Sequence, residues 1–164
     1  MAANWIDIAL TYLGTTEIAG SKHNKTILKW WKDIKSDFDD DETPWCAAFV
    51  GGVLEEAGIK STRSAAARSY LKFGTRLPKP VPGCIVVFWR GSPEGWSGHV
   101  GFVVGKDQYN NLMVLGGNQG DAVNIKPFSR DRVLGYFWPL NEALPDDPNL
   151  KVVNSNGRVS TNEA

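Results

Sequence analysis

The chain is poor in cysteine and histidine, with two of each among its 164 residues. Two cysteines, Cys46 and Cys84, are too few for a disulfide framework, and a chain made in the cytosol normally keeps both reduced. A charge excess is also missing, because 18 acidic side chains balance 18 basic ones. This balance gives no general attraction to nucleic acid or to an anionic membrane, so we expect neither as a partner.

Long apolar runs are absent as well. No stretch approaches the roughly 20 apolar residues of a membrane-spanning helix, so we expect no membrane span. The first residues, MAANWID, carry neither the basic region nor the continuous apolar region of a secretory signal. We therefore expect the chain to be synthesised as a cytoplasmic protein.

The chain is long enough, and apolar enough at 42% hydrophobic residues, to form one domain with its own core. Apolar residues at helical spacing predict helices near residues 5–13, 24–34, 45–57 and 64–73. Short β-branched runs between turn residues predict strands at residues 84–89, 99–104, 112–115, 122–125 and 133–138. Helices followed by strands indicate an α+β fold, with N-terminal helices packed on a C-terminal antiparallel β-sheet or half-barrel. We assign residues 1–140 to this domain and residues 141–164, which are polar, to a tail or extended arm.

Cys46 stands at the start of the third expected helix, after Thr43 and Pro44, which are residue types that favour a helix N-terminus. A cysteine in the first turn feels the positive end of the helix dipole, which favours the nucleophilic thiolate. The alternative is a small apolar residue that fills the helix–sheet interface.

His99 is the candidate base for this thiol, because it follows the glycine-rich residues 91–98 and opens an apolar strand, where a polar ring needs a reason. Such a base needs an acceptor on its other nitrogen to fix its orientation. The segment GGNQGD at residues 116–121 offers amides and a carboxylate after the next strand. We favour Asn118, with Gln119 and Asp121 as alternatives; a structural histidine and a plain turn remain the competing interpretations.

These residues together resemble the CHAP amidohydrolase/peptidase family and the wider NlpC-type papain-like superfamily, over roughly residues 3–139. The resemblance rests on PWCAAFV at 44–50, PG at 82–83, GHVG at 98–101 and GNQG at 117–120. Residues 14–17 and the Trp30-Trp31 pair also resemble a subfamily common among phage lysis proteins.

The resemblance implies a papain-like fold in which Cys46 is the nucleophile, His99 the base and Asn118 the residue that orients the imidazole. The chain departs from many relatives at Gly116, where they often carry a glutamate, and at Cys84, where they often carry an aspartate. The third role should therefore fall on Asn118, as in a Cys-His-Asn arrangement.

The expected function is hydrolysis of an amide bond in bacterial peptidoglycan, by an endopeptidase or an N-acetylmuramoyl-L-alanine amidase. We expect a monomeric phage endolysin that is made in the cytoplasm and acts in the periplasm or at the cell wall after release. One alternative is a secreted antibacterial effector amidase with an immunity protein. Others are a catalytically silent wall-binding or virion module and an amidase or transferase with another substrate.

Aromatic and acidic residues near the expected site suggest ligand contacts. Trp45 beside the nucleophile and Trp96 in the loop before His99 are candidates for the walls of a substrate groove, with Gln119 as a further substrate-binding candidate. The acidic run at residues 37–42 contains alternating carboxylates, and Asp37, Asp39 and Asp41 are weak candidates for Ca²⁺ ligands. A solvated acidic linker is the default interpretation, so we expect no cofactor.

Overall fold

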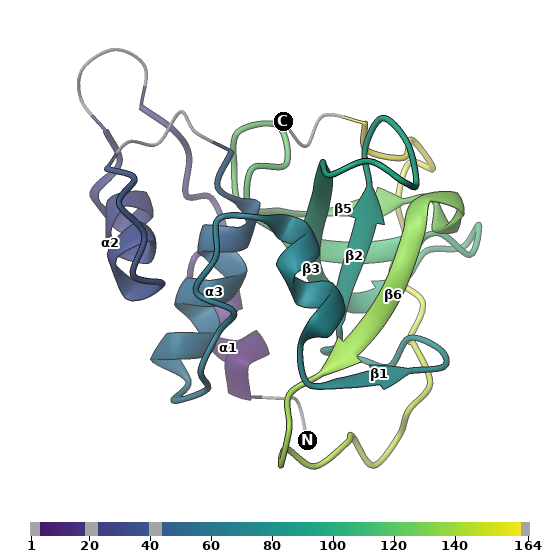
Figure 1. Cartoon of the computed structure of the whole chain (residues 1–164). Coiled ribbons are helices and arrows are strands. Elements are labelled where there is room, and N and C mark those ends of the chain that lie inside the picture. The colour runs from purple at the N-terminus through teal and green to yellow at the C-terminus, as the bar shows by residue number, and fades with distance from the viewer. Residues whose placement is uncertain (1–3, 19–22, 40–43, 162–164) are drawn as a thin grey trace.

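The computed structural model describes residues 4–18, 23–39 and 44–161. Three α-helices come first and are followed by a six-stranded sheet with two short 3-10 helices (Figure 1). The helices are α1 (Asn4–Leu10), α2 (Lys25–Asp33), α3 (Cys46–Glu56), η1 (Ala67–Lys72) and η2 (Arg130–Arg132). The strands are β1 (Thr75–Leu77), β2 (Ile85–Trp89), β3 (Gly98–Lys106), β4 (Leu112–Gly116), β5 (Asn124–Phe128) and β6 (Val133–Trp138).

The strands form one sheet in the order β1-β6-β2-β3-β4-β5, and all neighbouring pairs are antiparallel. Figure 1 shows the three α-helices gathered on one side of this curved sheet. The predicted α+β class, with N-terminal helices against an antiparallel sheet, is therefore confirmed. Within the described ranges, no helix combines the length and the apolar character that crossing a bilayer requires.

Helix α3 lies at the centre of the core, and its neighbours pack closely against both of its sides. Gly51 and Gly52 face α2, where a Cβ would lie 2.4 Å from Ile34 and 2.4 Å from Trp30 respectively. On the sheet side, the ring of Phe49 meets Phe102 of β3 at 6.1 Å between centroids. Gly52 thus leaves room for the indole of Trp30 on one side of α3. On the other side, the contact between Phe49 and Phe102 holds α3 against β3, the strand that carries His99.

Each expected helix and strand outside residues 64–77 corresponds to an element of the structure, although α1 ends at Leu10 instead of residue 13 and β5 spans Asn124–Phe128 instead of 122–125. Asn24 caps α2 as a residue of its type should, because its side chain accepts from the N–H of Thr26. Residues 64–73, predicted as an α-helix, contain only the 3-10 helix η1, and β1 follows it unpredicted. Strand β1 has only three residues, too few to show a period in the sequence. Its pairing with β6 is a tertiary contact, which a local pattern does not reveal.

The chain after β6 runs extended along the side of the sheet away from the helices (Figure 1). We call residues 150–161 the C-terminal arm. The overhang of β3 beyond β2 pairs with it, because Lys106 N–H donates to the Lys151 carbonyl and the Val153 N–H donates to the Lys106 carbonyl. Further along, the Ser160 N–H donates to the carbonyl of Pro127 in β5. The arm therefore lies along β3 and β5.

Candidate active site

Cys46 is the first residue of α3, so the predicted helix start is confirmed to within one residue. The residue is 5% exposed, and its thiol interacts with the backbone N–H of Val100, the residue after His99. Burial raises the pKa of the Cys46 thiol, whereas the N–H groups of Val100 and Ala47 and the charge of Arg90 lower it. The helix start was expected to favour the thiolate, but the cost of burying the charge outweighs these favourable interactions, so the resting thiol is neutral.

His99 lies on β3, opposite Phe88 of β2 in the antiparallel register, and its side chain is fully buried. The imidazole stacks on Phe128 of β5, with 5.3 Å between ring centroids and 4° between the ring planes. Phe88 stacks more loosely at 6.3 Å. Two aromatic rings therefore fix the plane of the imidazole, and only its nitrogens remain to be held by polar partners.

Gln119 contacts the imidazole, with 3.0 Å between its Oε1 and His99 Nε2. The amide orientation follows from its other contacts, because Gln119 Nε2 donates to the Val114 carbonyl at 3.2 Å and to the Asn124 carbonyl at 3.0 Å. Only an NH2 group can satisfy those two acceptors, so Oε1 must face the imidazole. His99 Nε2 is therefore the donor, and the lone pair of the neutral ring lies on Nδ1.

Gly116 at the end of β4 makes this contact sterically possible. A Cβ at this position would lie 2.2 Å from Gln119 Oε1 and 3.3 Å from His99 Nε2. The side chain of Gln119 therefore fills the space that a larger residue 116 would occupy. Asn124 supports the arrangement from β5, because its Nδ2 donates to the Gln119 carbonyl at 2.8 Å.

The prediction that Asn118 orients the imidazole differs from this geometry, in which Gln119 is the partner. Asn118 is fully buried at a left-handed φ of 60°, and neither its Oδ1 nor its Nδ2 has a hydrogen-bond partner among the described residues. Each buried polar group without a partner lowers the stability of the fold by about 1–3 kcal/mol. The buried amide of Asn118 therefore does not serve stability. Asp121, the third alternative, is exposed at the surface of the same turn.

Trp45 does not line an open groove, contrary to the prediction. Its side chain is fully buried, and its Nε1 donates to Glu17 Oε1 at 2.8 Å. The indole packs 5.8 Å from Trp30 and fills the space beside Gly117, where a Cβ would lie 2.7 Å from its ring. Trp45 therefore belongs to the core beneath the first turn of α3.

Trp96, in contrast, is 88% exposed in the loop between β2 and β3. Arg68 of η1 holds this loop, because its guanidinium donates to the carbonyls of Ser92, Pro93 and Ser97 at 2.8–2.9 Å. Sequence reasoning missed Arg68, since an arginine in a short polar segment gives no signal of what it binds. The loop is thus held by Arg68 and presents the large aromatic face of Trp96, three residues before His99 in the chain.

The remaining sequence candidates lie apart from this cluster. Asp37 and Asp39 are exposed, Asp41 lies outside the described residues, and the part of the chain that is described contains no group of three potential metal ligands. Cys84 is fully buried directly before β2, and burial raises the pKa of its thiol to about 12. Both cysteines are free.

A family model for the CHAP domain matches residues 38–118. The match includes Cys46, His99 and Asn118, and Gln119 follows directly after it. Together with the six-stranded antiparallel sheet, it confirms the expected papain-like α+β class. CHAP domains are generally hydrolases of peptidoglycan. No curated protein matches the chain.

Proposed function

We propose, from the premise that this chain carries a CHAP domain, that it hydrolyses amide bonds of peptidoglycan with Cys46 as nucleophile and His99 as base. The observation that carries this proposal is the orientation of His99. Gln119 Oε1 accepts from Nε2, which leaves the basic lone pair on Nδ1. This tautomer is the one that a base for the Cys46 thiol requires, because the ring nitrogen that takes the proton must carry a lone pair.

The reaction begins with a neutral thiol, because burial raises the pKa of Cys46. His99 Nδ1 takes the thiol proton as the sulfur attacks the carbonyl carbon of the amide, and the carbonyl electron pair moves to oxygen. The tetrahedral intermediate collapses, the C–N bond breaks, and the imidazolium protonates the leaving amine. Water then attacks the thioester with His99 again as base, which releases the acid and regenerates the thiol.

The oxyanion of this intermediate needs donors that are not already engaged. The N–H of Cys46 lies at the N-terminus of α3, where the helix itself supplies no acceptor for the first N–H groups. Asn118 is the second candidate, because its buried amide has no partner among the described residues. In this role Asn118 stays part of the catalytic group as a donor to substrate, and Gln119 orients the base.

Trp96 is the proposed contact for the polymer outside the catalytic group. An aromatic side chain with 88% exposure on a loop held by Arg68 offers a flat apolar face to a sugar or peptide.

We further propose that the protein is a monomeric endolysin of phage type, an endopeptidase or an amidase, that reaches the wall after release from the cytoplasm. An effector amidase with an immunity protein uses the same chemistry. The hydrogen-bonded pair of His99 and Gln119 favours an enzyme over a silent wall-binding or virion module, because a silent module has no use for an oriented base.

Clearing of purified peptidoglycan by the full chain tests this proposal, with two matched variants. Cys46→Ala and Cys84→Ala each remove one buried thiol of the core. We expect Cys84→Ala to keep the wild-type rate and Cys46→Ala to lose it, while circular dichroism shows both to be folded. Clearing at the wild-type rate by Cys46→Ala would rule out the thiol mechanism.

A further inference from the structure

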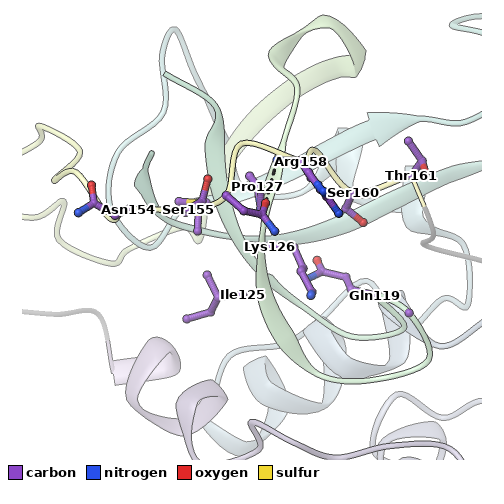
Figure 2. A pocket seen from close by; sticks show the side chains of 12 residues that line it. Gln119, Ile125, Lys126, Pro127, Asn154, Ser155, Arg158, Ser160 and Thr161 are labelled. Carbon is purple, nitrogen blue, oxygen red and sulfur yellow. Dashed lines mark hydrogen bonds between the residues drawn. The ribbon is translucent and has the colours of Figure 1, made fainter. Parts of the chain in front are cut away.

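A cavity of about 500 Å³ lies between the C-terminal arm and strands β4 and β5, with Gln119 among the side chains that line it (Figure 2). Its size is within the range of sites for small molecules and short peptides. The cavity is lined by Met113, Gln119, Gly120, Ile125, Lys126, Pro127, Asn154, Ser155, Asn156, Arg158, Ser160 and Thr161.

The charges around this cavity are of one sign. Lys126 comes from β5 and Arg158 from the arm, and the described residues of the lining include no aspartate or glutamate. Neither cation forms an ion pair within residues 4–18, 23–39 and 44–161. Two unpaired cations from different segments that face one cavity favour an anionic occupant.

The arm that supplies Arg158 is held in place by several hydrogen bonds. Ser155 Oγ donates to Asp107 Oδ2 at 2.6 Å, and the Ser155 N–H donates to Gln108 Oε1 at 2.9 Å. At the far end, the Ser160 N–H donates to the Pro127 carbonyl at 2.7 Å. Anchors on both sides of Arg158 fix that wall of the cavity before any ligand arrives, which lowers the entropic cost of binding.

The remaining lining groups suit a peptide better than an inorganic ion. Asn154 and Asn156 carry amides that can pair with peptide groups, and Met113, Ile125 and Pro127 form apolar patches for small side chains. The guanidinium of Arg158 matches the two oxygens of a carboxylate, and Lys126 adds a second positive charge.

We propose that this cavity binds a short peptide through its free carboxylate, as at the end of a peptidoglycan stem peptide. This inference rests on the proposed function for the choice of peptide. The site is distinct from the nucleophile, because neither Cys46 nor His99 lines the cavity, and Gln119 is the lining residue that also contacts His99. It anchors one wall peptide while the thiol acts on another bond.

Calorimetric titration of the full chain tests the proposal, with Cys46→Ala as host so that no peptide is consumed. The probes are a stem tetrapeptide with a free C-terminal carboxylate, the same peptide as its C-terminal amide, and glycerol phosphate. We expect the carboxylate form to bind about tenfold more tightly than the amide, the ratio that one charge-assisted hydrogen bond supplies. Lys126→Gln and Arg158→Gln should each remove most of that preference.

Lys79→Gln is the matched control, because Lys79 is exposed in the loop before β2 and lies outside the cavity; it should leave the preference unchanged. Equal binding of carboxylate and amide forms would overturn the inference, and so would glycerol phosphate binding as tightly as the peptide. Either result alongside normal clearing of peptidoglycan leaves the proposed function intact. Carboxylate-selective binding by a chain that clears no peptidoglycan would instead overturn the proposed function.

Discussion

A single methyl group at Gly116 tests whether Gln119 orients the catalytic imidazole. The Cβ of Gly116→Ala would lie 2.2 Å from Gln119 Oε1, which is closer than non-bonded atoms come, and 3.3 Å from His99 Nε2. Gly116 does not occupy the left-handed region, so alanine adds no backbone strain of its own. The amide must therefore withdraw, and the His99 hydrogen bond is lost while both of its partners remain in the chain.

The expected loss of activity follows from the strength of that bond. Leaving a buried donor or acceptor unpaired costs about 1–3 kcal/mol. If the bond is needed in the transition state, this cost lowers kcat/KM by roughly 5–150-fold. Gln119→Leu removes the same acceptor and should fall in the same range.

Rates of peptidoglycan clearing by Gly116→Ala, Gln119→Leu and the double variant form a double-mutant cycle. Because both changes break one contact, the double variant should lose little more than the worse single variant. Lys79→Gln is the control, since Lys79 is exposed in the loop before β2 and lies outside both the His99 cluster and the cavity, and it should keep the wild-type rate. A folded Gly116→Ala protein at full rate, or losses that multiply in the double variant, would refute this role of Gln119.

Three further predictions concern the thiol, the loop and the core. Burial raises the pKa of Cys46, so at pH 7 iodoacetamide should label Cys46 more slowly than it labels free glutathione, and the labelling rate should increase as the pH rises above 9. Mass spectrometry locates the label on the chain. Labelling of Cys46 faster than glutathione at pH 7 would contradict a neutral resting thiol. Trp96→Ala should raise KM for peptidoglycan several-fold with little change in kcat, because the exposed indole contacts the polymer and not the reacting atoms. An unchanged KM in initial-rate assays would show that Trp96 is not part of the binding surface. Gly52→Ala should lower the melting temperature, although alanine has the better helix propensity. The new Cβ would lie 2.4 Å from Trp30, and such overpacking costs about 1–3 kcal/mol. An unchanged or higher Tm would show that α2 can shift away from α3.

The sequence predicted those elements whose signals are local. Helix α2 has an apolar face and an Asn24 cap, and the strands β2 to β6 alternate with turn residues, so their order was visible along the chain. The start of α3 was visible for the same reason, and it placed Cys46 in the first turn. The short segments η1 and β1 have no such period and depend on contacts with the rest of the sheet.

The details of the site depend on contacts that a linear pattern does not carry. Asn118 and Gln119 are adjacent amides, and only the space beside Gly116 decides which one reaches His99. Trp45 and Trp96 are both tryptophans near motif residues, yet one is fully buried and the other is 88% exposed. The pKa of Cys46 likewise follows from burial against β3, which opposes the helix-terminus effect that the sequence suggested.

The product of the reaction tests the central claim most directly. Purified peptidoglycan treated with the full chain is analysed by mass spectrometry, with Cys46→Ala as the parallel sample. The account predicts newly freed amines from cleaved amide bonds, either on stem peptides for an endopeptidase or on L-alanine released from muramic acid for an amidase, and none with Cys46→Ala. Cleavage of glycosidic bonds alone, or the same products from both proteins, would contradict it.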